Sequence, residues 1–296
     1  MRALLSRASM PLRMNYRLRT SAQRQLPYFI VIGAQKGGTT SLIWNLGDHP
    51  QIKRALAKEI HFFDLNFSRG EDWYRAYFPP QTSRTISGEA TPAYLFYPFI
   101  AERIAQLVPN VKLIALLRDP VSRAYSHIQM EARKGRVKGN VLDVLRRDLR
   151  FLQQHPLDRE RFERYFYEMI ARTPQVEYPR DQAALKSSAS DREPFPLRSF
   201  LLRGFYFVQL SIWFEHFSRD QILILKSEDY FANPRSILEQ VIPPFLGLSN
   251  WTLPVYQPQN QEYPYPAIDP ALSDELHEFF RPYNQKLYHL LGVDFG

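Results

Sequence analysis

The sequence predicts an α/β fold in which helices cover both faces of a central parallel sheet, so that the protein has three layers. Residues 28–32, 111–117 and 221–225 are short apolar runs rich in β-branched side chains, the pattern of strands buried on both faces. Segments with helical periodicity separate these runs. Strands that alternate with helices along a chain are typical of parallel sheets, so we expect one such sheet here.

The helices are predicted from apolar periodicity and from capping residues. The first follows a glycine-rich loop after the first strand and ends before Pro50. Residues 98–108 and 205–217 each show an apolar face with helical spacing. Asp119-Pro120 and Asp269-Pro270 each combine an N-cap with proline at the first helical position, so a helix is expected to begin at each. The second of these opens the last helix of the chain.

We expect a single domain over residues 27–296, preceded by a basic arm over residues 1–26. The arm holds six arginines and no acidic residue, which predicts a disordered tail, although a transit peptide or a membrane-surface tether has a similar composition. Residues 135–197 are expected to form a variable insertion of helices broken by a mobile loop at 186–193. Residues 254–266 are rich in proline and tyrosine and predict irregular structure.

Composition narrows the classes of function. The chain has 38 Lys and Arg against 30 Asp and Glu, a net charge of +8, which favours anionic partners such as nucleotides or sulfated substrates. It has no cysteine, so disulfides, thiolate metal sites and cysteine nucleophiles are excluded, and a reducing, cytoplasmic location is expected. Since no apolar run approaches the roughly 18 residues that span a bilayer, we expect no transmembrane helix.

The loop at residues 33–41, Gly-Ala-Gln-Lys-Gly-Gly-Thr-Thr-Ser, carries the clearest chemical signal. A glycine loop between a buried strand and a helix N-terminus offers backbone N–H groups and a positive dipole end to phosphate or sulfate. Nucleotide hydrolases place lysine directly after the second glycine, whereas here Thr39 follows Gly38 and Lys36 lies inside the loop. This favours a cation beside a phosphate without a metal and makes Lys36 a catalytic candidate; the alternative is a tight turn with an exposed lysine.

Three segments together resemble the sulfotransferase family that uses 3′-phosphoadenosine 5′-phosphosulfate as donor and includes the heparan sulfate enzymes and a bacterial branch. They are the glycine loop, the run Glu59-Ile60-His61-Phe62-Phe63-Asp64, and the run from Leu117 to Ser126 that begins Leu-Arg-Asp-Pro. They occur in the order typical of the family. The similarity continues through residues 203–206 and 227–229 to the last helix, so it covers residues 28–296.

The resemblance implies a fold like that of P-loop NTPases and an in-line, metal-independent sulfuryl transfer to a hydroxyl or amine of a carbohydrate, lipid or other small molecule. It also implies that the donor is bound by Gln35, Lys36, Gly37, Gly38, Thr39, Thr40, Ser41, Arg118, Ser126 and Arg203. For Arg118 and Ser126, which would hold the 3′-phosphate, position agrees: they follow the carboxyl end of a strand, where ligands of open α/β sheets gather. Arg118 has the alternative of a structural ion pair.

Glu59 and His61 are the acceptor-side candidates. Sulfuryl transfer removes a proton from the acceptor, so a carboxylate or histidine must face the loop lysine. By resemblance Glu59 is the general base and His61 its neighbour; if the segment is extended, both side chains lie on one side. Without the resemblance, a surface glutamate beside a packed histidine is an equal interpretation.

Two departures from the family stand out. Ala90 replaces a lysine that contacts the acceptor in the heparan enzymes, and residues 259–263 replace a Lys-Gly clamp over the 3′-phosphate. The competing functions are a P-loop nucleotide or small-molecule kinase, a binding protein that has lost catalysis, and a nucleic-acid binder, of which no recognised module is present. The sequence leaves open the acceptor, the choice between O- and N-sulfation, and the oligomeric state.

Overall fold

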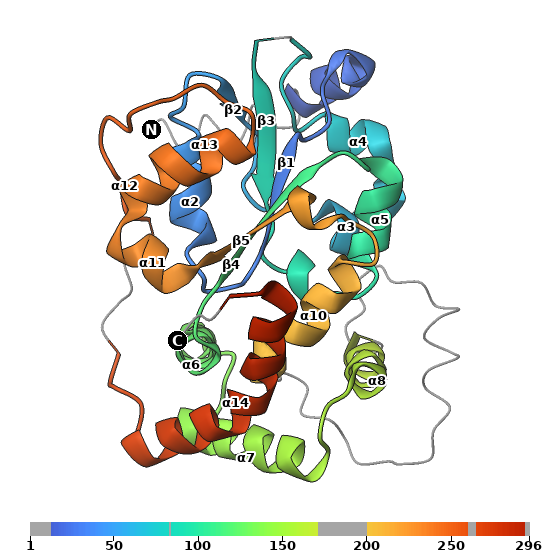
Figure 1. Cartoon of the computed structure of the whole chain (residues 1–296). Coiled ribbons are helices and arrows are strands. Elements are labelled where there is room, and N and C mark those ends of the chain that lie inside the picture. Colours follow the sequence, from blue (N-terminus) through green and yellow to red (C-terminus); the bar gives the residue numbers. More distant parts are fainter. Residues whose placement is uncertain (1–12, 83, 171–199, 260–264, 294–296) are drawn as a thin grey trace.

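A computed structural model describes residues 13–82, 84–170, 200–259 and 265–293. Its five-stranded sheet is parallel throughout and has the order β2-β3-β1-β4-β5 (Figure 1). The strands are β1 (Phe29–Gly33), β2 (Ile52–Arg54), β3 (Ile86–Ala90), β4 (Lys112–Leu117) and β5 (Ile222–Lys226). The α/β fold and the three expected strands are confirmed.

The two strands that the sequence analysis did not predict are short and polar. β2 exposes two of its three residues, and β3 contains Ser87, Gly88 and Glu89. Neither has the continuous apolar character by which a buried strand is recognised in a sequence. They belong to the sheet because their backbones pair with β3 and β1, which is a tertiary interaction.

The side chains of β1 alternate between two helical layers. Phe29 and Val31 pack with α2 (Thr39–Leu46), α11 (Ser227–Ala232) and α13 (Ile242–Phe245). Ile30 and Ile32 face the larger layer, which contains α5 (Ile100–Leu107), α6 (Pro120–Arg133), α10 (Tyr206–Trp213) and α14 (Pro270–Leu291). Figure 1 shows α2, α11 and α13 on one side of the sheet and α5 and α10 on the other. Burial on both faces explains why β1 is apolar at every position.

The helix predicted over residues 98–108 is α5, and the one predicted over 205–217 is α10, which ends earlier than expected, at Trp213. The smaller layer contains α2 (Thr39–Leu46), α11 (Ser227–Ala232), α12 (Pro234–Ser236), the π-helix η6 (Ile237–Val241) and α13 (Ile242–Phe245). The larger layer contains α3 (Phe62–Leu65), α4 (Glu71–Arg75), α5 (Ile100–Leu107), α6 (Pro120–Arg133), α7 (Val141–Gln154), α8 (Arg159–Ile170), α10 (Tyr206–Trp213) and α14 (Pro270–Leu291). Single 3-10 turns are η1 (Ser21–Gln23), η2 (Phe67–Arg69), η3 (Tyr94–Phe96), η4 (Leu202–Gly204) and η5 (Arg219–Gln221).

Both predicted proline N-caps are confirmed. The carboxylate of Asp119 accepts a hydrogen bond from the Ser122 amide, and that of Asp269 accepts one from the Leu272 amide. The helices expected in the insertion at 135–197 are α7 and α8. The loop predicted at 186–193 lies outside the described residues.

The prediction of a disordered arm up to residue 26 is wrong for its second half. Residues 13–19 are helical, and Arg17 donates hydrogen bonds to the carbonyls of Ala76 and Phe78, at 2.5 and 2.6 Å. Arg24 is buried and donates to the Phe78 carbonyl as well, at 3.0 Å. These arginines fasten the segment to the domain, a use that a count of charges does not reveal. Residues 1–12 lie outside the described part, and the single domain over 27–296 stays a prediction.

Replacing Arg17 by alanine is expected to destabilise the fold by about 1–3 kcal/mol, because two carbonyls lose a charged donor. Thermal unfolding followed by circular dichroism measures this as a lower melting temperature. Arg19→Ala is the matched control, since Arg19 lies exposed on the same helix. Equal melting temperatures for the two variants would contradict the anchoring role.

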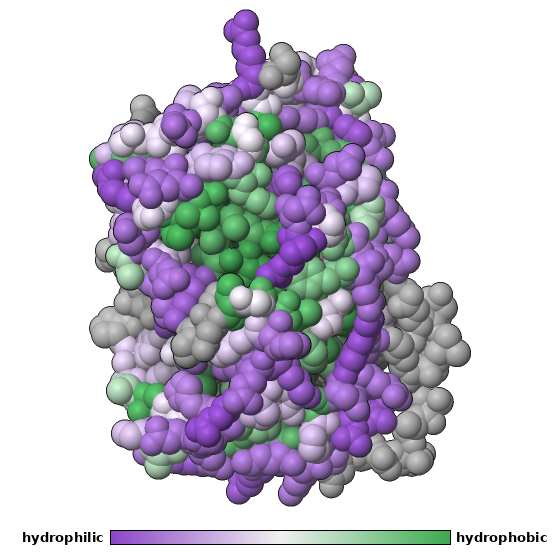
Figure 2. Space-filling model, in the orientation of Figure 1, coloured by the Kyte–Doolittle hydropathy of each residue, from purple (hydrophilic) through white to green (hydrophobic). Residues whose placement is uncertain are grey.

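The face in Figure 2 is mostly hydrophilic, with a hydrophobic area over the edge strand β5. The side chains of Leu223 and Ile224 in β5 are half-buried. No helix within the described residues has the length and apolar character needed to cross a membrane.

Candidate active site

A cavity of about 450 Å³ lies at the carboxyl ends of the strands, beside the glycine loop. β1 lies between β3 and β4. After β1 the chain forms β2 and β3 on one side of it and then crosses to form β4 on the other side, so β1 borders a topological switch point. The cavity is lined by Gln35, Lys36, Gly38, Thr39, Thr40, Ser41, Lys58, Glu59, Pro92, Met130, Lys134, Arg118, Phe231 and Gln259. The glycine loop and Glu59, which α2 and β2 separate in the sequence, therefore line the same cavity.

The glycine loop delivers the start of α2 to the cavity. Gly38, at φ 98°, is the N-cap of α2, and no side chain caps the helix. The first N–H groups of a helix have no partner within it, so they are available to an anion. A Cβ on Gly37 would lie 2.6 Å from the Leu116 carbonyl oxygen, so only glycine lets the loop pass this close to β4.

Arg118 joins the loop to β4. Its Nη1 donates to the Lys36 carbonyl at 3.2 Å, and its guanidinium lies 5.8 Å from the centre of the Phe231 ring. Phe231 is 46% exposed although it is a large aromatic residue. The Phe231 ring therefore offers an exposed aromatic surface in the cavity that Lys36 and Arg118 also line, and such a surface suits the stacking of a nucleobase.

Of the segment 259–263, which stands where the family has its Lys-Gly clamp, only Gln259 lies within the described residues. Gln259 exchanges two hydrogen bonds with the Ser41 hydroxyl, at 2.8 and 3.1 Å, and the amide of Asn45 bonds both the N–H and the carbonyl of Gln257. Residues 257–259 are thus tied to α2 by neutral hydrogen bonds. Ser41, assigned above to the donor, also serves this tie.

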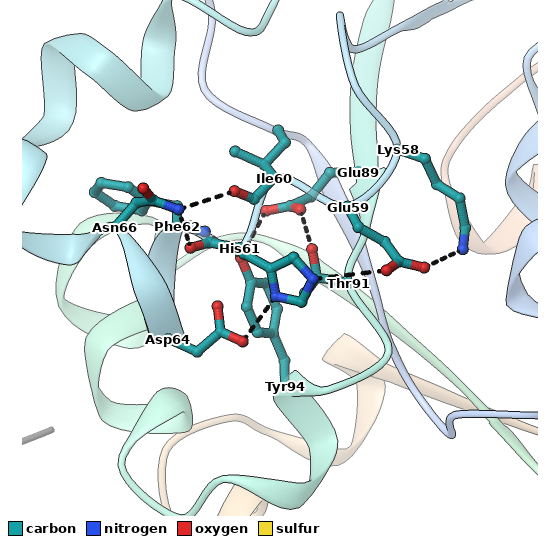
Figure 3. Close-up of polar contacts among 10 residues, drawn as sticks. All are labelled: Lys58, Glu59, Ile60, His61, Phe62, Asp64, Asn66, Glu89, Thr91 and Tyr94. Atoms are coloured by element: carbon teal, nitrogen blue, oxygen red, sulfur yellow. Dashed lines mark hydrogen bonds and ion pairs between the residues drawn. The ribbon is translucent and has the colours of Figure 1, made fainter. Parts of the chain in front are cut away.

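Glu59 and His61 come together, but their segment is not extended. His61 has φ 53° and is the N-cap of α3, so the expectation of regular strand alternation is wrong. Its Nε2 lies 3.6 Å from Glu59 Oε2, and its Nδ1 lies 2.9 Å from Asp64 Oδ2 (Figure 3). The turn at His61, rather than strand geometry, brings the imidazole between two carboxylates.

These contacts shift both pKa values. The hydrogen bond from His61, opposed by burial and reinforced by Lys58, lowers the pKa of Glu59 to about 2. Burial by itself would lower the pKa of His61, but the hydrogen bonds and charges of Asp64 and Glu59 outweigh it and raise that pKa to about 10. His61 is therefore an imidazolium at neutral pH, held between two carboxylates.

Behind this pair lies a buried carboxylate, Glu89 at the end of β3. It accepts hydrogen bonds from Tyr74 at 2.5 Å, Thr91 at 2.7 Å and Tyr94 at 3.4 Å. The Tyr94 hydroxyl accepts in turn from the Phe62 amide at 2.9 Å (Figure 3). The sequence analysis did not select Glu89, Tyr94 or Asp64 individually, and no local signal marked Glu89 as buried, because β3 was not predicted as a strand.

Four candidates lie away from the cavity lining. Gly37 is a buried residue of the loop, and His61 contacts Glu59 without lining the cavity itself. Ser126 is buried on α6, one turn before Met130, which does line the cavity. Arg203 packs its guanidinium 4.2 Å from the centre of the Phe96 ring, so its assignment to the donor has no support from the cavity.

Lining residues that the sequence analysis missed include Lys58, Lys134 and Phe231. Lys134 lies one turn beyond Met130 on the same face of α6, so helical spacing from Ser126 could have indicated it. Within the described ranges, no cluster of three or more His, Asp or Glu side chains has the arrangement of a metal site. Metal independence stays a prediction.

A glycine loop at the switch point of a parallel sheet with helices on both faces is typical of α/β proteins that bind anionic ligands. The chain belongs to the sulfotransferase domain family, whose pattern matches residues 26–253. A crystal structure of a sulfotransferase from Alicyclobacillus acidocaldarius is 26% identical, covers 91% of this chain and 97% of its own, and has a TM-score of 0.66.

Two curated relatives extend the comparison. The membrane-associated sulfotransferase kil1 of Dictyostelium discoideum is 29% identical, over 91% of this chain and 66% of that protein. Human heparan sulfate glucosamine 3-O-sulfotransferase 3B1 is 28% identical, over 93% of this chain and 66% of that protein. The chain thus spans just under two thirds of the length of these relatives.

Proposed function

We propose that the protein transfers a sulfuryl group from 3′-phosphoadenosine 5′-phosphosulfate to a hydroxyl or amine of a small-molecule or glycan acceptor. The observation that carries this proposal is that Lys36 of the glycine loop and the carboxylate of Glu59 line one cavity. Membership of the sulfotransferase domain family supports it. One relative is named for heparan sulfate, so a glycan is one candidate acceptor. Ala90 argues against a polyanionic glycan, because it stands where the heparan enzymes have a lysine that contacts the acceptor.

The residues present suit this donor. Two cations, Lys36 and Arg118, and the uncapped start of α2 suit its phosphates, and the exposed ring of Phe231 suits its adenine. The donor supplies the sulfuryl group and an adenosine bisphosphate as leaving group. Lys36 would neutralise the charge that develops on the leaving phosphate, without a metal.

Glu59 would accept the proton of the acceptor. A carboxylate whose pKa is about 2 is a weak base, because its pairing with Lys58 and His61 stabilises the anion. Lys58 lines the cavity, so an anionic group of donor or acceptor can draw its ammonium away from Glu59. Loss of the Lys58 pair would raise the pKa of Glu59 and strengthen the base, while the hydrogen bond from His61, the larger cause of the low pKa, would remain and orient the carboxylate.

The kinase alternative is not favoured. A P-loop kinase needs a lysine directly before the loop threonine, where Gly38 precedes Thr39. The alternative of a binding protein without catalysis is decided by turnover. The cytoplasmic location expected from the cysteine-free sequence stays a prediction.

Calorimetric titration with 3′-phosphoadenosine 5′-phosphate, without magnesium, tests the donor. We expect the wild type to bind it and Arg118→Ala to lose a factor of about 30 or more in affinity, as is typical when one partner of a charge pair that binding buries is removed. Arg281→Ala is the control, because it removes an exposed arginine paired with Glu278 on α14. Binding of ATP with magnesium, but not of the bisphosphate, would overturn the proposal in favour of a kinase.

A further inference from the structure

The carboxylate of Glu89 is 1% exposed, and its hydrogen-bond partners among the described residues are the neutral hydroxyls of Tyr74, Thr91 and Tyr94. Burial raises its pKa to about 7, although hydrogen bonds from Tyr74 and Thr91 oppose the shift. A neutral side chain at this position would avoid the cost of burying a charge. A buried carboxylate at this position indicates a role that an uncharged hydrogen-bond acceptor, such as a glutamine side chain, does not fulfil.

The hydrogen bonds around Glu89 have a definite direction. The Tyr94 hydroxyl donates to Glu89 Oε1, at 3.4 Å, which is the direction required when the carboxylate is ionised and can only accept. The lone pairs of that hydroxyl are then free to accept from the amides of Phe62 and Phe63, at 2.9 and 3.4 Å. Phe62 and Phe63 are the first residues of α3, directly after His61.

The same contacts hold the conformation of His61. A non-glycine residue at φ 53° is strained, so neighbouring interactions must hold it there. Tyr94 fixes the backbone that follows His61, and Asn66 fixes the residue itself by donating to its carbonyl at 2.9 Å. The imidazole thereby stays between Glu59 and Asp64 (Figure 3).

We propose that Glu89 is a positioning residue which, through the Tyr94 hydroxyl, holds the start of α3 and thereby keeps His61 beside Glu59. The assignment rests on the proposed function, in which Glu59 accepts the acceptor proton. The titratable groups that face Glu89 are Tyr74 of α4, Tyr94 of η3, and His61 and Asp64 at α3. Glu89 is thus connected to Glu59 through the Tyr94 side chain, the backbone at the start of α3 and the His61 side chain.

Tyr94→Phe and Tyr74→Phe form a matched pair for the test. Each removes one hydroxyl that donates to Glu89 Oε1 and changes no charge, but only the Tyr94 hydroxyl also bonds α3. The readout is the pKa of the His61 ring, from an NMR titration of the full chain without donor or acceptor. Thermal unfolding of each variant accompanies it.

We expect Tyr94→Phe to lower the His61 pKa by about 1 unit or more, a tenfold loss of proton affinity, because the ring leaves its carboxylates. Tyr74→Phe should leave it unchanged, and Glu89→Gln combined with Tyr94→Phe should shift it no further than Glu89→Gln alone. An unchanged value in Tyr94→Phe, or equal shifts in both tyrosine variants, overturns the proposal. If Glu89→Gln does not fold, the tyrosine pair decides.

Turnover separates this inference from the proposed function. With labelled phosphosulfate donor and a panel of hydroxyl and amine acceptors, kcat should fall in Tyr94→Phe, because the Glu59 carboxylate loses the His61 contact that orients it, even though its pKa rises. In Tyr74→Phe kcat should not fall, and bisphosphate affinity should be equal in both variants. Absence of bisphosphate binding in the wild type would contradict the proposed function, while the His61 titration would still report whether Glu89 positions the ring.

Discussion

Replacing Glu59 by glutamine is expected to lower kcat for sulfuryl transfer by a factor of about 10² to 10⁴, the usual contribution of a positioned general base. Glutamine has nearly the same shape but cannot accept the acceptor proton. The Glu59 side chain is 44% exposed, so the change should leave the fold intact. Turnover of labelled phosphosulfate on the acceptor panel measures the loss, and calorimetry with the bisphosphate should show unchanged affinity.

Glu71→Gln is the control for this experiment. Glu71 is also an exposed carboxylate paired with a cation, Arg75, but it lies outside the cavity lining. It should retain wild-type turnover. Retained turnover in Glu59→Gln would assign the base to another group and would leave the donor site unaffected.

Replacing Lys36 by methionine is expected to lower kcat by a factor of about 10² to 10³, the usual loss when a group that stabilises transition-state charge is removed. Lys36 lies inside the glycine loop and lines the cavity, where the leaving phosphate gains negative charge. Methionine keeps the length and apolar stem of lysine without the ammonium. The loop backbone should therefore keep its hydrogen bond from Arg118 to the Lys36 carbonyl.

The two quantities to compare in Lys36→Met are kcat and the affinity for the bisphosphate. A large loss of kcat with a small loss of affinity indicates that Lys36 acts in the transition state. Lys53→Met, on the exposed part of β2, should change neither quantity. A loss of affinity with unchanged kcat would reduce Lys36 to a binding residue.

The glycine loop and the strands β1, β4 and β5 could be predicted because their signals are local. An apolar run, a glycine pair and a proline after an aspartate each depend on a few neighbouring residues. β2, β3 and the helical segment of residues 13–19 could not be predicted in the same way. The first two depend on pairing with a distant strand, and the last depends on carbonyls of Ala76 and Phe78 that accept from Arg17.

From the sequence one can recognise the kind of site: a loop with an internal lysine at the start of a helix, and a carboxylate two residues before a histidine. The sequence does not reveal that Lys36 and Glu59 face one cavity, or that a left-handed turn at His61 places its ring against Asp64. These arrangements depend on contacts between distant segments, such as the hydrogen bond that the Tyr94 hydroxyl accepts from the Phe62 amide, 32 residues earlier, and local sequence patterns do not indicate such contacts.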